Sequence, residues 1–376
     1  MLASVTGPEE AAVALDGGAD VIDLKDPAQG GLGAVPPALV RETVTAVAGR
    51  RQVSAVAGNV PLLPDRVLPA VAALADAGVG WVKLGLFPGG DLAATLRALV
   101  PMAKRVRLVG VLFADHEPDF SAVAALASAG FAGAMLDTQA KGAGRLLSHC
   151  DLPALARFVA LCRAHDLMSG LAGRLEPPDV PRLLVLQPGL LGFRGALCAQ
   201  DRAGPIDAAH VRLIRALIPP ELAPGNGAQA DWRVLAARGY APDRPGDPAM
   251  TDRVFVRDLV LPVNIGAYAH EHGQPQRVRF DVSVQVARPA AQGRVQPVRD
   301  MRDIYSYDII SDGIRMLIAA GHVDLVETLA EQIAELLLGD PRVVSATVQV
   351  TKLDTGSGHV GVAIERTRDT LPVRAA

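Results

Sequence analysis

Regular alternation of strand-like and helix-like segments over the first 218 residues constrains the fold of this chain more than any other feature. Helical stretches lie between most of the strand candidates, and this alternation predicts a parallel sheet. Eight such units in about 220 residues predict a closed (β/α)8 TIM barrel. An open doubly wound sheet is the alternative, but it would usually carry a glycine-rich phosphate turn after its first strand, and none is present. The eight strand candidates are Leu2–Val5, Val21–Asp26, Val53–Gly58, Trp81–Leu86, Arg107–Asp115, Gly133–Thr138, Leu167–Gly173 and Leu190–Ala196.

Composition limits the size of the core and the kinds of partner. The chain has 376 residues, 50% hydrophobic and 20% charged, so it can bury the core of a barrel and a further domain. The net charge is -3 and only 4% of the residues are aromatic, so no nucleic-acid partner is expected. No uninterrupted apolar run reaches about 18 residues, and Met1–Glu10 lacks the pattern of a secretory signal. We therefore expect a cytoplasmic protein without a membrane span.

The cysteines and histidines show no metal-binding pattern. Cys150, Cys162 and Cys198 are odd in number and widely spaced, which fits neither a disulfide framework nor a zinc site. Such cysteines suit a reducing cytoplasm. The histidines near them lack the spacing of metal ligands, and we interpret them as surface or packing residues. The sequence therefore predicts no metal and no other cofactor.

The segment Val21–Asp26 combines a strand pattern with two charges on one face. Because strand side chains alternate between faces, Ile22 and Leu24 share one face, whereas Asp23 and Lys25 share the other. Charged side chains are rarely buried unless they are paired or used. Taken alone, the segment could equally be an edge strand with an exposed ion pair.

The same alternation recurs in later strands and favours a shared site. It directs three further charged side chains inward, and in a barrel the catalytic groups come from the carboxyl ends of the strands. We therefore expect a charged cluster at one mouth of the barrel, to which Asp115 and Lys141 could also belong. The alternative is a set of unrelated surface charges. The residues expected to converge are Asp23, Lys25, Lys83, Asp137 and Arg194.

A mouth with two lysines suggests Schiff-base chemistry. Lysines that share a site lower each other's pKa by repulsion, and desolvation lowers it further. A neutral amine is nucleophilic and forms a Schiff base with a carbonyl compound, while nearby carboxylates move protons. Small residues in Leu171–Arg174 and Gly192–Gly195 would let backbone N–H groups reach a phosphate, although glycines also occur as plain turns. The residues thus predict a metal-free, aldolase-like lyase for small phosphorylated carbonyl compounds.

A set of short segments in the first 218 residues is specific in its order and spacing. The segments are Asp23–Pro27, Gly31–Ala34, Val82–Leu86, Leu136–Lys141, Leu171–Gly173, Gly192–Ala196 and Asp201-Arg202. With them, the first 218 residues resemble the (5-formylfuran-3-yl)methyl phosphate synthase family of methanofuran biosynthesis, which condenses two glyceraldehyde 3-phosphate molecules. The resemblance implies that Lys25 forms the Schiff base and that Lys83 donates and accepts protons. It implies active-site positions for Asp23, Asp137 and Lys141, and we expect Gly173, Arg194 and Gly195 to bind substrate. Phe113–His116 departs from the family, which more often has an aromatic residue after the aspartate.

A second pattern follows a region rich in proline and glycine. We interpret residues 219–249 as a flexible linker, with one or two helical turns at Asp231–Ala237. Residues 250–368 then show a ββααββ order typical of an α+β domain, and 369–376 form a tail. The barrel domain is expected to cover 1–218. The predicted elements are Val254–Leu261, Arg277–Val286, Ser306–Ala320, Leu325–Leu338, Val343–Lys352 and His359–Arg366.

Residues 251–367 contain a second set of segments with a specific order and spacing. The segments are Ile265–Glu271, Gln276-Arg277, Phe280–Val282, Tyr305–Asp308, Leu325–Glu331 and Val350–Lys352. With them, residues 251–367 resemble dihydroneopterin aldolase, a tunnelling-fold family that cleaves a pterin side chain without a Schiff base or a metal. The resemblance implies that Glu327 and Val326 hold the pterin, that Lys352 handles protons, and that Glu271 and Tyr307 contact substrate. Each of these polar residues, taken singly, could also be a plain surface residue. Leu353–Gly358 replaces the proline-rich loop usual in the family.

Together the two resemblances predict a bifunctional lyase and aldolase acting on a phosphorylated aldehyde and a dihydropterin. They point to neighbouring pathways, methanofuran-type and pterin C1-carrier synthesis, which include tetrahydromethanopterin and folate-like metabolism. The aldolase family forms closed rings, so a homo-oligomer is expected. The alternative is that only one domain is catalytic and the other serves as an oligomerisation module.

Overall fold

The computed structural model describes residues 1–140, 144–199, 204–218, 246–288, 290–291, 294–295, 297, 304–355 and 358–371. The chain divides into two compact units, Met1–Ala228 and Gln229–Ala376. Most of the predicted linker, including the expected helical turns at Asp231–Ala237, lies outside the described residues, as does most of the predicted tail. The predicted domain boundaries therefore stay a prediction.

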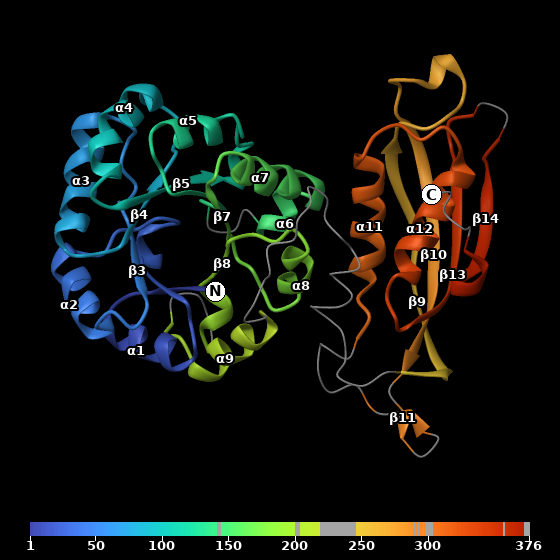
Figure 1. Cartoon of the computed structure of the whole chain (residues 1–376), viewed down its shortest axis with the longest axis horizontal. Helices are drawn as coiled ribbons and strands as arrows, with labels where there is room; N and C mark the ends of the chain where they lie inside the picture. The colour runs from blue at the N-terminus through green and yellow to red at the C-terminus, as the bar shows by residue number, and fades with distance from the viewer. Residues whose placement is uncertain are drawn as a thin grey trace. The chain divides into compact units, whose positions relative to one another are not determined.

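The first unit is a closed barrel of eight strands in chain order. Each strand pairs in parallel with the next, and β1 closes the barrel by pairing with β8. Figure 1 shows the helices arranged around the strands. The predicted (β/α)8 barrel is confirmed, with several strands ending earlier than expected. The strands are β1 (Leu2–Val5), β2 (Val21–Leu24), β3 (Gln52–Val56), β4 (Trp81–Gly85), β5 (Arg107–Phe113), β6 (Gly133–Asp137), β7 (Met168–Leu171) and β8 (Leu190–Phe193).

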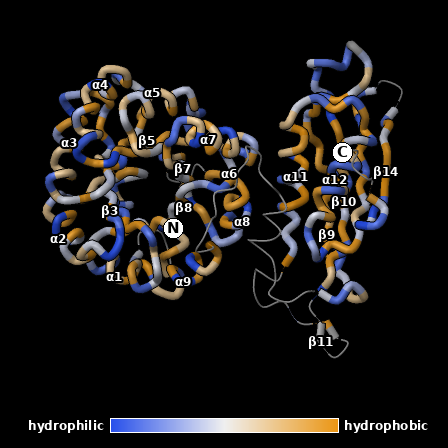
Figure 2. Tube along the Cα trace, in the orientation of Figure 1, coloured by the Kyte–Doolittle hydropathy of each residue, from blue (hydrophilic) through white to orange (hydrophobic). Residues whose placement is uncertain are grey.

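Local sequence explains where the barrel helices begin. Proline occupies the first turn of α1, α2 and α3, where its missing N–H costs no hydrogen bond. Asp91 and Asp151 cap α4 and α7 by accepting hydrogen bonds from the amides of Ala94 and Ala154. In Figure 2 the barrel helices show hydrophobic and hydrophilic colours in alternation, as expected of helices that bury one face. The helices are α1 (Pro8–Asp16), α2 (Pro37–Val47), α3 (Pro64–Asp76), α4 (Leu92–Ala103), α5 (Ala122–Ser128), α6 (Leu146–His149), α7 (Leu152–Ala164), α8 (Asp179–Leu184), α9 (Ala208–Leu217), and the 3-10 turns η1 (Pro27–Gln29), η2 (Ala114–His116) and η3 (Gly195–Leu197).

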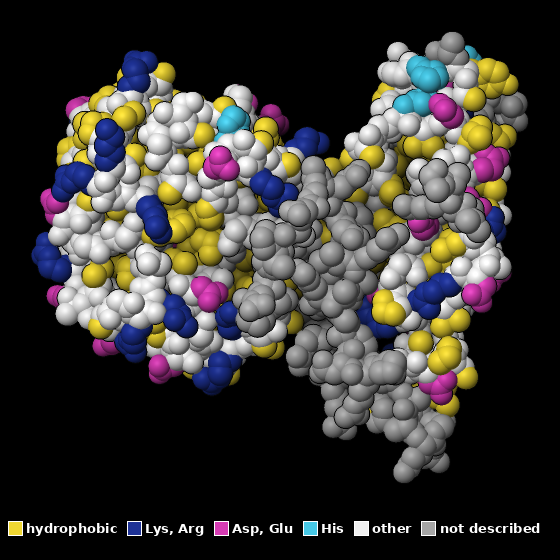
Figure 3. Space-filling model, in the orientation of Figure 1, with side chains coloured by type: hydrophobic (Ala, Val, Ile, Leu, Met, Phe, Trp, Pro, Cys, Tyr) yellow, Lys and Arg dark blue, Asp and Glu magenta, His cyan; other side chains and the backbone are white. Residues whose placement is uncertain are grey.

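The interior of the barrel is filled by side chains rather than open. Strand β5 contributes Val109, Val111 and Phe113, and Leu32 packs onto them from the loop after β2. Full burial of an aliphatic or aromatic side chain stabilises a fold by roughly 1.5–3 kcal/mol, so this layer holds the mouth residues on a rigid base. Figure 3 shows hydrophobic side chains at the centre of the barrel face in view, with charged side chains around its rim.

The second unit is an antiparallel sheet of four strands in the order β14-β13-β10-β9, with two helices. Helix α11 packs against β9, and α12 packs against β13 and β14. The predicted α+β tunnelling fold is confirmed. Strands β9 and β14 are the outer strands, so each presents one backbone edge. The elements are β9 (Asp247–Val263), η4 (Ala269–Glu271), β10 (Gln276–Arg288), β11 (Ala290–Ala291), β12 (Arg294–Val295), α11 (Tyr307–Ala319), α12 (Val326–Leu338), β13 (Val343–Lys352), β14 (Val360–Thr367) and η6 (Arg368–Thr370).

None of the described helices is long and apolar enough to cross a membrane.

Candidate active sites

Asp23 forms the centre of a polar cluster inside the barrel. Its carboxylate accepts hydrogen bonds from the hydroxyls of Ser4 at 3.1 Å and Ser54 at 2.5 Å. Lys83 donates to the same carboxylate at 2.5 Å, and Asp23 has no exposed surface. Burial pulls the pKa of Asp23 upward, but the charges of Lys83 and Lys25 and the hydrogen bonds outweigh it and hold that pKa below its ordinary value. Asp23 is therefore a carboxylate at neutral pH.

A second buried pair lies beside the first. Lys25 Nζ is 3.6 Å from the Asp137 carboxylate, and both residues are about 5% exposed. The amide of Thr138 donates to the other oxygen of Asp137 at 2.8 Å. Lys25 follows β2, while Asp137 ends β6, so the barrel brings these two residues together from different strands. The structure thus places four of the predicted residues at the carboxyl ends of the strands.

Asp115 is used to hold a loop. Its carboxylate accepts hydrogen bonds from the backbone amides of Gln139 and Ala140, just after β6. Desolvation raises the pKa of Asp115, but the hydrogen bonds from these amides have the larger combined effect. The pKa of Asp115 therefore lies below its ordinary value. The Asp115 carboxylate therefore supports the backbone of the segment that follows β6, just before Lys141. Lys141 itself lies outside the described residues.

Arg194 was expected to point into the mouth of the barrel. Its guanidinium is held by groups from β1, from α1 and from the segment before α9. It donates to Glu10 at 2.5 Å, to the Ser4 carbonyl at 3.2 Å and to the Gly204 carbonyl at 2.8 Å. Desolvation raises the pKa of Glu10, but Arg194 and the amide of Thr6 lower it more, so that pKa falls below its ordinary value. The buried ion pair fixes the loop after β8 against α1.

The two predicted glycines, Gly173 and Gly195, lie in the loops that follow the carboxyl ends of β7 and β8. Gly173 has a φ of +116°, and a Cβ added there would lie 3.0 Å from Cγ2 of Thr138. Glycine therefore permits the loop after β7 to approach the end of β6. Gly195 begins the 3-10 turn that follows Arg194.

Sequence reasoning missed the groups that orient the charged residues. Ser4 and Ser54 both lie on predicted strands, so strand alternation could have placed them on the same face as Asp23. No sequence signal connects Glu10 with Arg194, which is 184 residues away.

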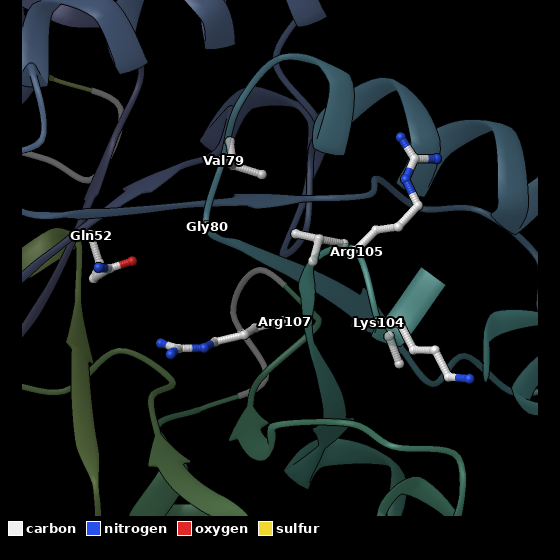
Figure 4. Close-up of a pocket in the computed structure, with 8 residues that line it drawn as sticks. Gln52, Val79, Gly80, Lys104, Arg105 and Arg107 are labelled. Atoms are coloured by element: carbon white, nitrogen blue, oxygen red, sulfur yellow. The ribbon is translucent and has the colours of Figure 1, made fainter. Parts of the chain in front are cut away.

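A pocket of about 340 Å³ lies at the opposite end of the barrel. Its walls come from residues at or before the start of β3, β4 and β5, whereas the buried lysines lie toward the strand ends. In Figure 4 the side chains of Gln52 and Arg107 extend toward each other, whereas Lys104 and Arg105 extend away from them. Arg105 is paired with Asp76 at 2.9 Å. This pocket is therefore separate from the lysine–carboxylate cluster.

The second unit has its own lysine–carboxylate pair. Lys352, the last residue of β13, donates to Glu271, which also accepts from Gln276 at 2.9 Å and from the Tyr268 amide at 3.1 Å. These hydrogen bonds, that of Lys352 above all, lower the pKa of Glu271 to about 2. Gly266 has a φ of +136°, and a Cβ there would lie 2.1 Å from the carboxyl carbon of Glu271. The pair depends on a glycine at this position.

The other predicted residues of the second unit lie apart from this pair within one chain. Tyr307 begins α11 and is 64% exposed. Val326 begins α12 as a half-buried residue, and the adjacent Glu327 is exposed. In the part of the chain that the structure describes, no hydrogen bond or ion pair connects Tyr307 or Glu327 with Lys352.

One group of described side chains could hold a metal ion. His272, His322 and Asp324 offer ligand atoms that all lie within 4.8 Å of one another. Sequence spacing does not indicate this group, because His272 precedes His322 and Asp324 by about 50 residues.

Fold and side chains together define a class: a (β/α)8 barrel with a buried lysine–carboxylate site, joined to an α+β unit with a second such pair. The chain belongs to the 4-HFC-P synthase family, whose sequence profile matches residues 1–215. Residues 254–365 match the dihydroneopterin aldolase family. Both are enzyme families, and both expected resemblances are confirmed.

The matches to relatives of the barrel extend over most of the length of each relative. A Methylorubrum extorquens protein, provisionally named a (5-formylfuran-3-yl)methyl phosphate synthase, is 48% identical over 56% of this chain and 88% of its own. The (5-formylfuran-3-yl)methyl phosphate synthase of Methanosarcina mazei is 31% identical over 55% of this chain and 93% of its own.

A solved structure resembles the second unit. Dihydroneopterin aldolase from Burkholderia thailandensis, bound to guanine, is 28% identical, covers 32% of this chain and 94% of its own, and has a TM-score of 0.27.

Proposed function

We propose that the chain is a bifunctional enzyme. Its barrel would condense two glyceraldehyde 3-phosphate molecules to (5-formylfuran-3-yl)methyl phosphate, as a carbon–oxygen lyase acting on phosphates. Its second unit, as an aldehyde-lyase, would cleave 7,8-dihydroneopterin or a related dihydropterin to 6-hydroxymethyl-7,8-dihydropterin and glycolaldehyde. The observation that carries the proposal is the buried set of two lysines and two carboxylates at the strand ends of a barrel from the 4-HFC-P synthase family.

In the barrel, Lys25 is the proposed nucleophile. Its amine adds to an aldehyde carbonyl, water leaves, and the resulting Schiff base makes the neighbouring carbon acidic enough to form a new carbon–carbon bond. Asp137, 3.6 Å from Lys25 Nζ, stabilises the protonated form of the nitrogen. The whole condensation releases one phosphate and two water molecules for each furan product.

Lys83 is the proposed proton donor and acceptor. Asp23 remains ionised because its pKa is lowered, and Lys83 Nζ donates a hydrogen bond to its carboxylate at 2.5 Å. Lys141 would complete the charged set. Gly173 and Gly195 would let backbone amides approach a substrate phosphate, and the Arg194–Glu10 pair would hold the loop that carries Gly195.

In the second unit, Lys352 is the proposed proton carrier. Glu271 holds its ammonium group, and Glu327 would accept paired N–H donors from the amino edge of the pterin. Tyr307 and Glu327 are exposed in one chain, which favours a site completed by another copy. We therefore propose a homo-oligomer in which Tyr307 reaches the pocket of a neighbour.

The second candidate role for one unit is assembly alone. The outer position of β9 and β14 favours it, because their backbone edges can pair with another copy of the chain. Separate losses of the two activities would distinguish a chain with two catalytic units from a chain in which one unit serves only in assembly. In the full chain, Lys25→Ala should remove only the condensation and Lys352→Ala only the pterin cleavage.

Trapping tests the proposed nucleophile. Borohydride added with glyceraldehyde 3-phosphate should attach covalent mass to the peptide that contains Lys25. Lys25→Ala should lose this adduct, whereas Lys83→Ala should retain some of it. An adduct found only on Lys83 would reverse the assignment.

A further inference from the structure

Three metal-ligating side chains meet at one end of the second unit. His272 follows η4, while His322 and Asp324 lie in the loop between α11 and α12. The two segments are bound together, since the Gly266 amide donates to the Val323 carbonyl at 3.0 Å. Figure 3 shows histidine side chains next to an acidic one at an end of this unit.

The ring of His322 is oriented like that of a metal ligand. Its Nε2 lies 2.8 Å from the Gly266 carbonyl, to which it donates. The lone pair is then on Nδ1, which is buried and has no hydrogen-bond partner among the described residues. Histidines that bind metals usually donate their other ring N–H to a backbone carbonyl or a carboxylate, which fixes the ring. His322 already makes this second contact through Nε2, and its Nδ1 is available to bind a metal ion.

The other two candidate ligands lie beside the His322 ring. The His272 ring stacks on His322 with the centroids 4.1 Å apart, and Asp324 Oδ1 lies 3.5 Å from Nε2 of His322. Tetrahedral zinc holds such ligands at about 2.0–2.2 Å, so neighbouring ligand atoms lie about 3.4 Å apart. In this structure, one candidate ligand atom of each residue lies within 4.8 Å of those of the other two. Because His272 and Asp324 are exposed, the His272 ring can turn out of the stack and the Asp324 side chain can rotate without disturbing the core.

We propose that His322 Nδ1, a ring nitrogen of His272 and the Asp324 carboxylate bind one divalent transition metal ion of the zinc class, with water as the fourth ligand. Two imidazoles favour zinc, nickel or copper over magnesium and calcium, which prefer oxygen ligands. The metal connects the segment that carries Glu271 with the loop between α11 and α12. It has no chemical step in the pterin reaction, and its role is to fix this turn.

Titration of the untagged, metal-stripped full chain tests the proposal. Isothermal titration with ZnCl2, and elemental analysis after dialysis, should show one bound zinc ion per chain. MgCl2 should not compete at equal concentration. Zinc should also raise the midpoint of thermal unfolding of the second unit.

Variants decide whether these residues are the ligands. His272→Gln and Asp324→Asn alter exposed residues and should fold, and each should weaken zinc binding about 100-fold. His270→Gln is the matched control, since His270 is an exposed neighbour that stacks on Tyr268 outside the cluster, and it should bind zinc like the unaltered chain. Zinc binding that survives unchanged in both His272→Gln and Asp324→Asn, or no binding by the unaltered chain, overturns the proposal.

Discussion

At the scale of single residues, the barrel site consists of charges that depend on one another. Asp23 has no exposed surface, and Lys83 supplies its closest opposite charge. Removing one partner of a buried ion pair costs about 3–5 kcal/mol, because the remaining charge is left without compensation. The same residues therefore determine both the stability of the barrel and its proposed chemistry.

Lys83→Met should lower the free energy of unfolding of the barrel by roughly 3 kcal/mol, because Lys83 attracts the buried Asp23 carboxylate more strongly than Lys25 does. The double variant Asp23→Asn with Lys83→Met should recover part of this loss, since no buried charge then lacks its partner. Urea unfolding of the full chain, followed by circular dichroism, measures both. Equal stability of Lys83→Met and the unaltered chain would contradict the pairing.

Glu271 makes the stability of the second unit depend on pH. Its pKa is lowered from an ordinary value of 4.5 to about 2, chiefly by the hydrogen bond from Lys352. Stability from this pair is therefore complete above about pH 4.5 and is lost as the pH falls toward 2. Glu271→Gln should flatten the decline of the urea midpoint between about pH 5 and pH 3. Glu365→Gln, an exposed change on β14, is the control and should leave the slope as it is.

Some residue positions could be predicted from the sequence and others could not. Strand alternation placed Asp23, Lys83 and Asp137 inside the barrel, because the period of a strand is fixed by local geometry. The partner of Arg194 could not be predicted, since Glu10 is 184 residues away and only the closure of the barrel brings the two together. The meeting of His272 with His322 likewise depends on backbone pairing between distant loops.

At the scale of elements, the regular strands were predictable, and their ends were less so. Strand β9 begins at Asp247, although its alternating pattern predicts a start at Val254. The extra residues are mostly exposed and polar, and they are held by pairing with the end of β10. Because this part of β9 is held by backbone pairing, its sequence lacks the alternation of apolar and polar residues from which a strand is predicted.

The turn before η4 depends on one glycine. Gly266→Ala would place a Cβ against the Glu271 carboxyl group and require a φ of +136°, so the Glu271–Lys352 pair should be displaced. We expect a loss of pterin cleavage of at least tenfold in kcat/KM, with the barrel reaction unchanged as an internal control. Gly321→Ala has a similar φ of +140° with no atom within 4 Å, and should cost stability while largely retaining activity. Similar activities of the two variants would show that the close approach is unimportant.

At the scale of the whole molecule, the residues proposed to bind the pterin do not come together within the described part of one chain. Glu271 and Lys352 form a partly buried pair, whereas Tyr307 is 64% exposed and makes no described contact with that pair. The outer strands β9 and β14 offer backbone edges through which copies of the second unit can join. The resemblance to dihydroneopterin aldolase predicts the same arrangement, with Tyr307 of one chain reaching the lysine of another.

Mixing two inactive variants tests this arrangement. Tyr307→Ala and Lys352→Ala remove opposite sides of each shared site, so each protein alone should be nearly inactive. After dissociation and reassembly in equal amounts, about a quarter of the sites should combine an intact tyrosine with an intact lysine, because a heterologous contact takes one side from each partner. Pterin cleavage should return to about a quarter of its original rate, while each variant reassembled alone stays inactive. If mixed oligomers, confirmed by mass spectrometry, are as inactive as their parents, Tyr307 serves its own chain and the shared site is wrong.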